Sequence, residues 1–240
     1  MRRWCAILGS SVILEARKPL VELLRTLDGV SQLIARGSPL PAFDYHCPLM
    51  SLPLAFRTEL NTIPAPQRYI SADPDRVAAW QVRLGEKTRP RIGIAWSGDP
   101  WNRDRLNRST GLAAMRALFC EDFEWFSLHN DLTPIDAALL SSLDQPHHFG
   151  EEMNFVETAA VIELMDLVIS VDTSIAHLAE AMGKPLWILL PFRPDWRWLV
   201  DREDSPWYPS ARLFKQETRG DWAGVMNRVG QALKSRFEIP

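Results

Sequence analysis

The chain has 240 residues, of which 46% are apolar and 24% charged, a balance that supports a hydrophobic core and argues against an intrinsically disordered chain. Lysine and arginine number 27 against 30 aspartates and glutamates, so the net charge of -3 argues against a generally basic, nucleic-acid-coating protein. The longest apolar runs, such as 186–190, are far shorter than the ~20 residues that span a bilayer, so we expect no membrane span.

The cysteines Cys5, Cys47 and Cys120 lie far apart and form neither a disulfide framework nor a CxxC metal site. Arg2 and Arg3 precede only a short apolar stretch without a cleavage site, so no secretory signal is expected. We therefore expect a cytoplasmic protein.

The first part of the chain predicts a small α/β unit. Strands are expected at 11–15 and 32–35, a helix between them at 19–27, and a further element at 43–47. Four prolines in 48–66 predict a connector without regular structure. Asp73 then predicts a helix N-cap. We assign 1–70 to a partial N-terminal lobe with its linker and 71–240 to a C-terminal lobe.

The C-terminal lobe alternates apolar strands with amphipathic helices. Strands are expected at 91–96, 125–128, 147–149, 167–171, 186–190 and 211–214. Helices are expected to begin at Ser109 or Thr110, Thr133, Asn154 (as a capping box with Glu157), Thr173 and Asp221. This alternation predicts a doubly wound parallel sheet with right-handed crossovers.

A polar stretch, Asp172 to His177, follows the expected strand 167–171. Open parallel sheets bind ligands at the carboxyl ends of their strands, and a helix N-terminus attracts phosphate. Asp172, Thr173 and Ser174 suit such a site, and equally a plain helix cap. His177 lies opposite the apolar stripe of this helix, which leaves either a ligand contact or a solvated surface histidine.

Two further loops follow expected strands at the same edge. In 97–109, Gly98 permits close backbone approach, and Arg108 is the arginine best placed to bind phosphate; a solvated loop is the alternative. In 191–198, Phe192, Asp195 and Trp196 can contact a base or a sugar, although packing over an apolar part of the lobe explains Trp196 equally well and is the favoured role of Trp198.

The motifs of several other enzyme classes are missing. The chain has no GxGxxG, no GxxxxGK[ST] and no GxSxG, which argues against dinucleotide oxidoreductases, P-loop NTPases and α/β-hydrolases. His147 and His148 have no partner at metal-ligand spacing, so no metal is expected.

Residues 169–185, ISVDTSIAHLAEAMGKP, resemble the nucleotide-sugar signature of the ADP-heptose:lipopolysaccharide heptosyltransferases, glycosyltransferase family 9. More closely, the chain resembles the glycosyltransferase-like domain found behind tetratricopeptide repeats in many bacterial proteins. The other shared pieces are 43–53, 98–109, 189–198 and 204–209.

The resemblance implies a GT-B fold with two Rossmann-like lobes. It implies that the C-terminal lobe binds the donor diphosphate through Asp172, Thr173, Ser174, His177 and Arg108, with no metal or other cofactor. Asp172→Ala and His177→Ala would then weaken nucleoside diphosphate binding without unfolding the protein.

The chain departs from the family pattern in its first lobe, where we expect about one β-α unit to be missing and residues 4–8 to be the remnant of its helix. The loop at 102–106 also differs, and His129 stands where the family has glutamine. Asp44 and His46, expected at the inner end of an N-lobe strand, are the candidate catalytic residues; a turn and a structural histidine are the alternative.

These observations predict an enzyme that transfers a sugar from a nucleoside-diphosphate donor to a protein or glycan acceptor. The alternatives are an inactive GT-B remnant that binds a nucleotide or another protein, and, less favoured, an epimerase-like enzyme. Expected partners are the donor, the acceptor, a tetratricopeptide-repeat protein and a second copy of the chain. Nucleic acid is not an expected partner.

Overall fold

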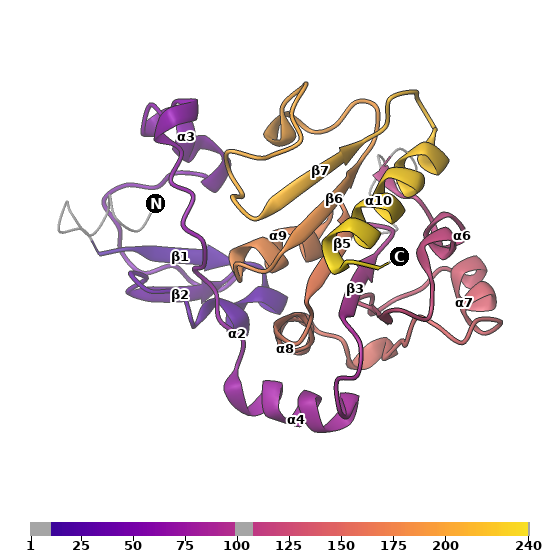
Figure 1. Ribbon diagram of the computed structural model, residues 1–240. Helices are drawn as coiled ribbons and strands as arrows, with labels where there is room; N and C mark the ends of the chain where they lie inside the picture. Colours follow the sequence, from indigo (N-terminus) through magenta and orange to yellow (C-terminus); the bar gives the residue numbers. More distant parts are fainter. Residues whose placement is uncertain (1–10, 99–107, 240) are drawn as a thin grey trace.

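The computed structural model describes residues 11–98 and 108–239. Its main feature is a five-stranded sheet of β3 (Arg91–Ala95), β4 (Glu124–Ser127), β5 (Leu167–Val171), β6 (Leu186–Leu190) and β7 (Ala211–Lys215), in the order β4-β3-β5-β6-β7 (Figure 1). All four neighbouring pairs run parallel. The expected Rossmann-like C-terminal lobe is therefore confirmed.

Helices cover both faces of this sheet. This cover is required because the strands carry apolar side chains on both faces. Along β6, Leu186, Ile188 and Leu190 belong to one buried cluster, whereas Trp187 and Leu189 belong to the other. Because successive side chains of a strand point to opposite faces, each face needs its own cover. α8 (Phe155–Glu163) and α9 (Ser174–Ala181) bury their apolar sides in the first cluster; α6 (Leu112–Met115) and α10 (Trp222–Phe237) bury theirs in the second.

Most of the expected helix starts are confirmed by their caps. The side chains of Asp73, Thr133, Asn154 and Asp221 accept backbone N–H groups at the starts of α4 (Pro74–Leu84), α7 (Pro134–Leu140), α8 and α10. The expected capping box of α8 is incomplete, because the Glu157 carboxylate accepts instead from Arg76 and from the Trp80 indole. This contact joins α8 to α4.

The expected cap at Ser109 or Thr110 is wrong. α6 follows Gly111 without a side-chain cap, because the Thr110 hydroxyl donates to the Trp96 carbonyl and thereby ties the loop to the end of β3. α6 is short and continues into the 3-10 turn η4 (Arg116–Leu118). The expected strand at 147–149 is a single bridge between Phe126 and His147, followed by η5 (Gly150–Glu152).

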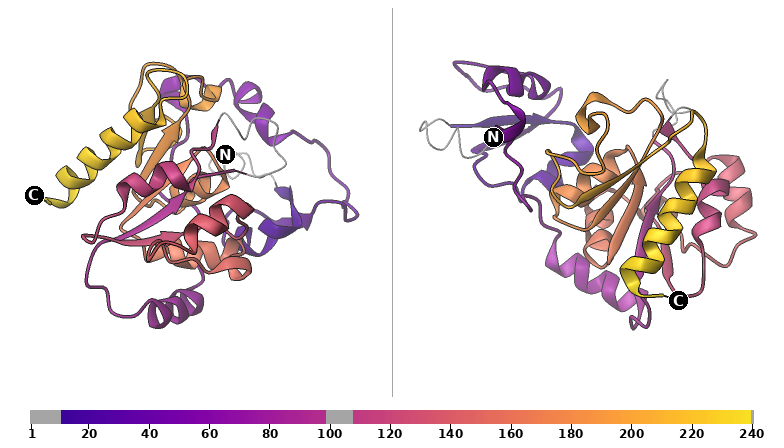
Figure 2. Two further views of the ribbon diagram at one scale, coloured as in Figure 1. Left: turned by 90° about the vertical axis from the view of Figure 1, so that its right-hand side faces the viewer. Right: turned by 45° about the horizontal axis from the view of Figure 1, so that its top comes forward.

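The N-terminal region, residues 11–72, contains a parallel pair of short strands, β1 (Ile13–Ala16) and β2 (Gln32–Ala35), connected by η1 (Lys18–Leu20) and α2 (Val21–Leu24). It lies beside the sheet in the views of Figures 1 and 2. No strand or helix forms at 43–47, contrary to expectation. The proline-rich connector is not irregular throughout, because η2 (Leu49–Ser51), α3 (Leu52–Ala55) and η3 (Leu60–Thr62) interrupt it. The expected α/β fold is confirmed; the reduced N-terminal lobe and its boundary at residue 70 stay predictions.

Two expectations, the remnant helix at 4–8 and the altered loop at 102–106, lie outside the described residues. Within the described part of the chain, no helix is both long and apolar enough to cross a membrane.

Candidate functional site

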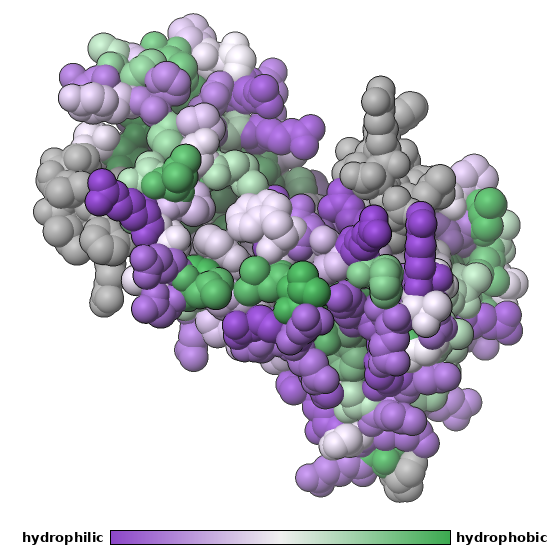
Figure 3. Space-filling model, turned by 90° about the horizontal axis from the view of Figure 1, so that it is seen from above, coloured by the Kyte–Doolittle hydropathy of each residue, from purple (hydrophilic) through white to green (hydrophobic). Residues whose placement is uncertain are grey.

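The loops after β3 and β5 meet at the carboxyl edge of the sheet. β3 and β5 are neighbours, with Ala95 opposite Ser170. A Cβ atom built on Gly98 would lie 3.7 Å from Cγ2 of Thr173, so the two loops touch at this point. That distance is an ordinary van der Waals contact, so the close approach does not itself require glycine. From above, the molecule is hollowed between the N-terminal region, at upper left, and the rest of the chain (Figure 3).

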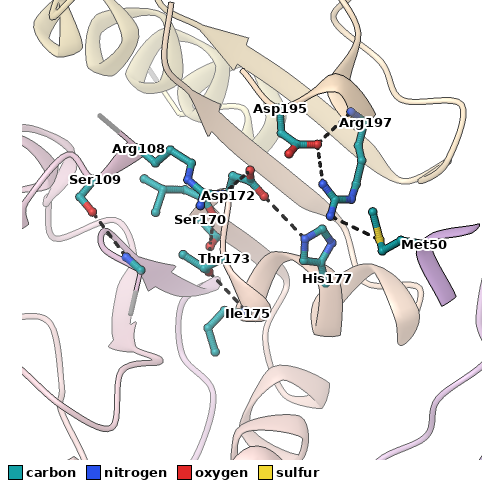
Figure 4. Close-up of polar contacts among 12 residues, drawn as sticks. Met50, Arg108, Ser109, Ser170, Asp172, Thr173, Ile175, His177, Asp195 and Arg197 are labelled. Atoms are coloured by element: carbon teal, nitrogen blue, oxygen red, sulfur yellow. Dashed lines mark hydrogen bonds and ion pairs between the residues drawn. The ribbon is translucent and has the colours of Figure 1, made fainter. Parts of the chain in front are cut away.

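Thr173 caps α9, in agreement with the plain helix cap that the sequence allows as the alternative to a ligand site. Its Oγ1 accepts from the backbone N–H of Ile175 at 3.3 Å and lies 3.1 Å from the Ser170 hydroxyl (Figure 4). Ser174, the first residue of the helix, is exposed. The first turn of α9 therefore opens to solvent on the side of Ser174.

Asp172 is the centre of a charged cluster. Its Oδ2 accepts from Nη1 of Arg108 at 3.1 Å, and its Oδ1 lies 3.6 Å from Nε2 of His177 (Figure 4). Burial would raise the pKa of this carboxyl, but His177 and Arg108 together hold the pKa below its ordinary value. Asp172 is thus an ionised, buried carboxylate that holds two side chains at the start of α9.

His177 is neither a core histidine nor a free surface one. Its side chain is 36% exposed, its Nδ1 lies 2.7 Å from the Tyr208 hydroxyl, and its ring stacks on Trp198 with centroids 5.8 Å apart. The expected packing role of Trp198 is confirmed, since this residue is buried. Tyr208 is not among the site residues predicted from the sequence, although the shared piece 204–209 contains it.

The segment 191–198 presents two exposed aromatic rings, of which Trp196 is the more exposed. Trp196 is 54% exposed, packs edge-on against Trp207 and lies 5.3 Å from the Arg197 guanidinium. Asp195 caps the turn η6 (Trp196–Trp198) and also accepts from the Arg197 side chain. Its carboxylate is therefore already paired.

Phe192, also expected to contact the donor, is 41% exposed, and its backbone N–H donates to Gln216. The Arg197 guanidinium lies 3.9 Å from the sulfur of Met50 (Figure 4). This contact links the segment 191–198 to the N-terminal region.

The structure does not bring Asp44 and His46 into the cluster around Asp172. Both are exposed in a stretch without regular structure, so their expected position at the end of a strand is wrong. Within the described residues, His46 has a ring contact with Phe43, and no hydrogen bond or ion pair connects either residue to Asp172, Arg108 or His177. What any of the predicted site residues bind stays a prediction.

The described residues include no group of three histidine, cysteine, aspartate or glutamate side chains that could hold a metal ion. Positive charge at this edge of the sheet comes from the partly exposed Arg108 side chain and from the partial charge of the α9 N-terminus. A guanidinium beside a helix N-terminus is an arrangement suited to an anion.

Residues 138–189 match the model of glycosyltransferase family 9 (heptosyltransferase). The matched segment includes β5, the start of α9 and the residues Asp172, Thr173, Ser174 and His177. This segment therefore resembles the corresponding part of glycosyltransferase family 9. The family resemblance expected from the sequence is therefore confirmed, whereas the association with tetratricopeptide repeats stays a prediction.

Two individual proteins are also similar. The chain is 26% identical over 200 residues to protein FlbA of Caulobacter vibrioides, an alignment that covers 80% of this chain and 33% of FlbA. The structure of E. coli ADP-heptose LPS heptosyltransferase II matches with a TM-score of 0.49 at 15% identity, covering 73% of this chain and 57% of that one. The chain thus spans about a third of the length of FlbA and little more than half of the E. coli protein.

Proposed function

We propose that this family 9-like domain binds a nucleoside-diphosphate sugar at the start of α9 and transfers the sugar to a protein or glycan acceptor without a metal ion. One observation carries the proposal: Arg108, from the loop after β3, is held by Asp172 next to the N-terminus of α9. Asp172 and the start of α9 lie within the segment that matches the glycosyltransferase family.

The diphosphate of the donor would accept hydrogen bonds from Arg108, from the Ser174 hydroxyl and from N–H groups in the first turn of α9. As the bond to the sugar breaks, negative charge grows on the leaving diphosphate. The guanidinium and the helix N-terminus are already oriented toward this charge, so they stabilise the transition state electrostatically. A metal ion that neutralised the diphosphate would then not be required.

Asp172 takes a different role in this proposal from the direct donor contact that the sequence favours. A buried carboxylate repels phosphate, but this one is paired with Arg108 and lies next to His177. Asp172 would therefore orient the donor-binding side chains rather than bind the donor. Trp196, exposed and near Arg197, offers a face on which the base or the sugar could stack.

A donor-binding domain without transferase activity is the second candidate. The observation that favours it is the position of Asp44 and His46, which are exposed in an irregular stretch. A catalytic base must lie within hydrogen-bonding reach of the acceptor hydroxyl, and an irregular stretch does not orient these groups. Donor turnover with and without acceptor distinguishes the two candidates. The size of the protein in solution, measured by light scattering, tests the proposed second copy of the chain.

Arg108→Ala tests the proposed site. We expect it to weaken the binding of ADP, UDP or GDP, measured by titration calorimetry, by about 10- to 100-fold, because a hydrogen bond to a charged group contributes about 1.5–3 kcal/mol. Asp172→Ala and His177→Ala are expected to weaken binding in the same direction. Arg116→Ala, in the exposed turn η4, is the matched control and should bind like wild type.

The proposal fails if the wild-type protein binds none of the three nucleotides, or if Arg108→Ala binds as tightly as Arg116→Ala. Thermal unfolding of each variant shows whether a loss of binding reflects a loss of fold.

A further inference from the structure

Tyr208, His177 and Asp172 form a line of polar contacts across the start of α9. Tyr208 lies in the loop before β7, 31 positions after His177. We infer that the Tyr208 hydroxyl donates to Nδ1 of His177 and thereby holds the ring with its proton on Nε2, facing Asp172. Only the consequence for donor binding rests on the proposed function.

The first argument comes from Asp172. An ionised carboxylate can only accept hydrogen bonds, and Nε2 of His177 lies 3.6 Å from its Oδ1. A neutral imidazole carries one proton, so one nitrogen donates and the other accepts. A lone pair on Nε2 would face the carboxylate and be repelled, whereas an N–H is attracted. Asp172 therefore favours the proton on Nε2.

The second argument comes from Tyr208. Its hydroxyl lies 2.7 Å from Nδ1, the distance of a good hydrogen bond. With the ring proton on Nε2, Nδ1 is an acceptor and the phenol must donate. Burial raises the pKa of this phenol well above its ordinary value, so Tyr208 keeps the proton that it donates. Both neighbours of the ring thus favour the same tautomer.

The ring plane is also restrained. His177 and Trp198 stack with an angle of 12° between their planes, and Trp198 is buried against Tyr208. Stacking sets the plane, and the hydroxyl of Tyr208 sets which edge of the ring faces Asp172. Tyr208 is thus a positioning residue that acts through His177.

The consequence concerns the role of His177 in the proposed reaction. A ring with its proton on Nε2 points that N–H toward Asp172, the carboxylate that holds Arg108 at the start of α9, and has no free nitrogen there to take up a proton. His177 would therefore help to bind the donor and would not serve as the catalytic base.

Long-range ¹H–¹⁵N spectroscopy of the ¹⁵N-histidine protein tests the tautomer without any ligand. The chain has five histidines, and the spectrum of His177→Ala assigns the signal of His177. In mildly alkaline buffer we expect the proton on Nε2 and an Nδ1 signal typical of a hydrogen-bonded acceptor. Tyr208→Phe removes the hydroxyl and should move Nδ1 to the position of a free acceptor. Tyr45→Phe, at a phenol that is 94% exposed, should change nothing.

A proton on Nδ1 or on both nitrogens of the wild-type ring, or an Nδ1 signal that Tyr208→Phe leaves unchanged, would overturn the inference. Calorimetry with ADP, UDP and GDP tests the consequence separately. We expect Tyr208→Phe to weaken binding about 3- to 10-fold, with no added loss in the double variant with His177→Ala, because the two residues act as one unit.

If Tyr208→Phe binds nucleotide like wild type, the assignment of Tyr208 to donor binding is overturned. If wild type binds none of the nucleotides, the proposed function fails, while the spectra still decide the tautomer.

Discussion

The sheet lobe and the N-terminal region of this protein differ in how much of their apolar surface they bury. Every residue of β3, β5 and β6 is buried, and both faces of the sheet have their own cluster. In residues 11–72, only Ala16, Leu23 and Ile70 are buried apolar residues. Eight large apolar or aromatic side chains there are at least a third exposed: Leu40, Phe43, Tyr45, Leu49, Met50, Leu54, Phe56 and Leu60.

This difference indicates that the N-terminal region depends on the sheet lobe for its burial. Leu23 and Ile70 are buried in the cluster between the sheet, α8 and α9, so they contribute to the core of the larger lobe. The backbone N–H groups of Tyr69 and Ile70 donate to the Ala181 carbonyl, and Arg68 pairs with Glu163 at 2.9 Å. The N-terminal region is thus held against a lobe that already has a core. The Arg108–Asp172–His177 cluster is built on that lobe.

A matched pair of Leu→Ala substitutions tests this contrast and has the largest expected effect. Leu189 in β6 is fully buried, whereas Leu54 in α3 is 84% exposed. Leu189→Ala should lower the free energy of unfolding by about 2–5 kcal/mol through lost burial and a cavity. Leu54→Ala should change it by less than about 0.5 kcal/mol. Urea unfolding followed by tryptophan fluorescence measures both, and a similar loss in the two variants would contradict the contrast.

The core of the sheet lobe also predicts sensitivity to acid. Nε2 of His129 accepts from the backbone N–H of Trp96 at 3.0 Å, and burial lowers the pKa of this histidine to about 4. The folded protein therefore holds the ring neutral, and the stability that depends on it is present above about pH 6.5 and lost as the pH falls toward 4. We expect a loss of up to about 3 kcal/mol over this interval, measured by urea unfolding at a series of pH values.

His129→Gln is the control for this prediction. The glutamine amide can accept the same backbone N–H but does not titrate, so the variant should lose less stability between pH 6.5 and 4. Burial lowers the pKa of His148 and raises that of Glu180, and both groups stay in the variant, so their contributions cancel in the difference. Equal acid sensitivity of the two proteins would assign the effect to other groups.

The sequence predicts the sheet lobe well because its signals are local. The alternating faces of β6 and the capping side chains of Asp73, Asn154 and Asp221 each depend on a few neighbouring residues. The site is predicted in part for the same reason, since Asp172, Thr173 and His177 lie within six residues at a strand–helix junction. Arg108, 64 positions away from Asp172, could be included because carboxyl ends of neighbouring parallel strands meet.

Other parts of the site depend on packing that no local pattern records. Tyr208, in the irregular loop before β7, contacts His177 across 31 positions that include β6 and η6. Conversely, the sequence predicts a further element at 43–47 with Asp44 and His46 at the end of a strand, and these residues lie instead in an exposed, irregular stretch. A segment that buries little has weak sequence periodicity, so the N-terminal region is also the region that the sequence predicts least well.

A pair of glycine substitutions, with the smallest expected effect, tests how the two regions are joined. Gly183 and Gly220 both have positive φ, at +69° and +85°, so alanine is strained at either position. They differ in space: a Cβ atom at Gly183 would lie 2.4 Å from the Gln67 carbonyl oxygen, and one at Gly220 would meet nothing within 4 Å. Gly220→Ala should cost about 1 kcal/mol, and Gly183→Ala about 1–2 kcal/mol more, because the backbone at Gln67 must move. Hydrogen exchange should then speed up at the Tyr69 and Ile70 amides in Gly183→Ala alone. If both variants lose the same stability and those amides stay protected, the connector does not depend on its close contact with the end of α9.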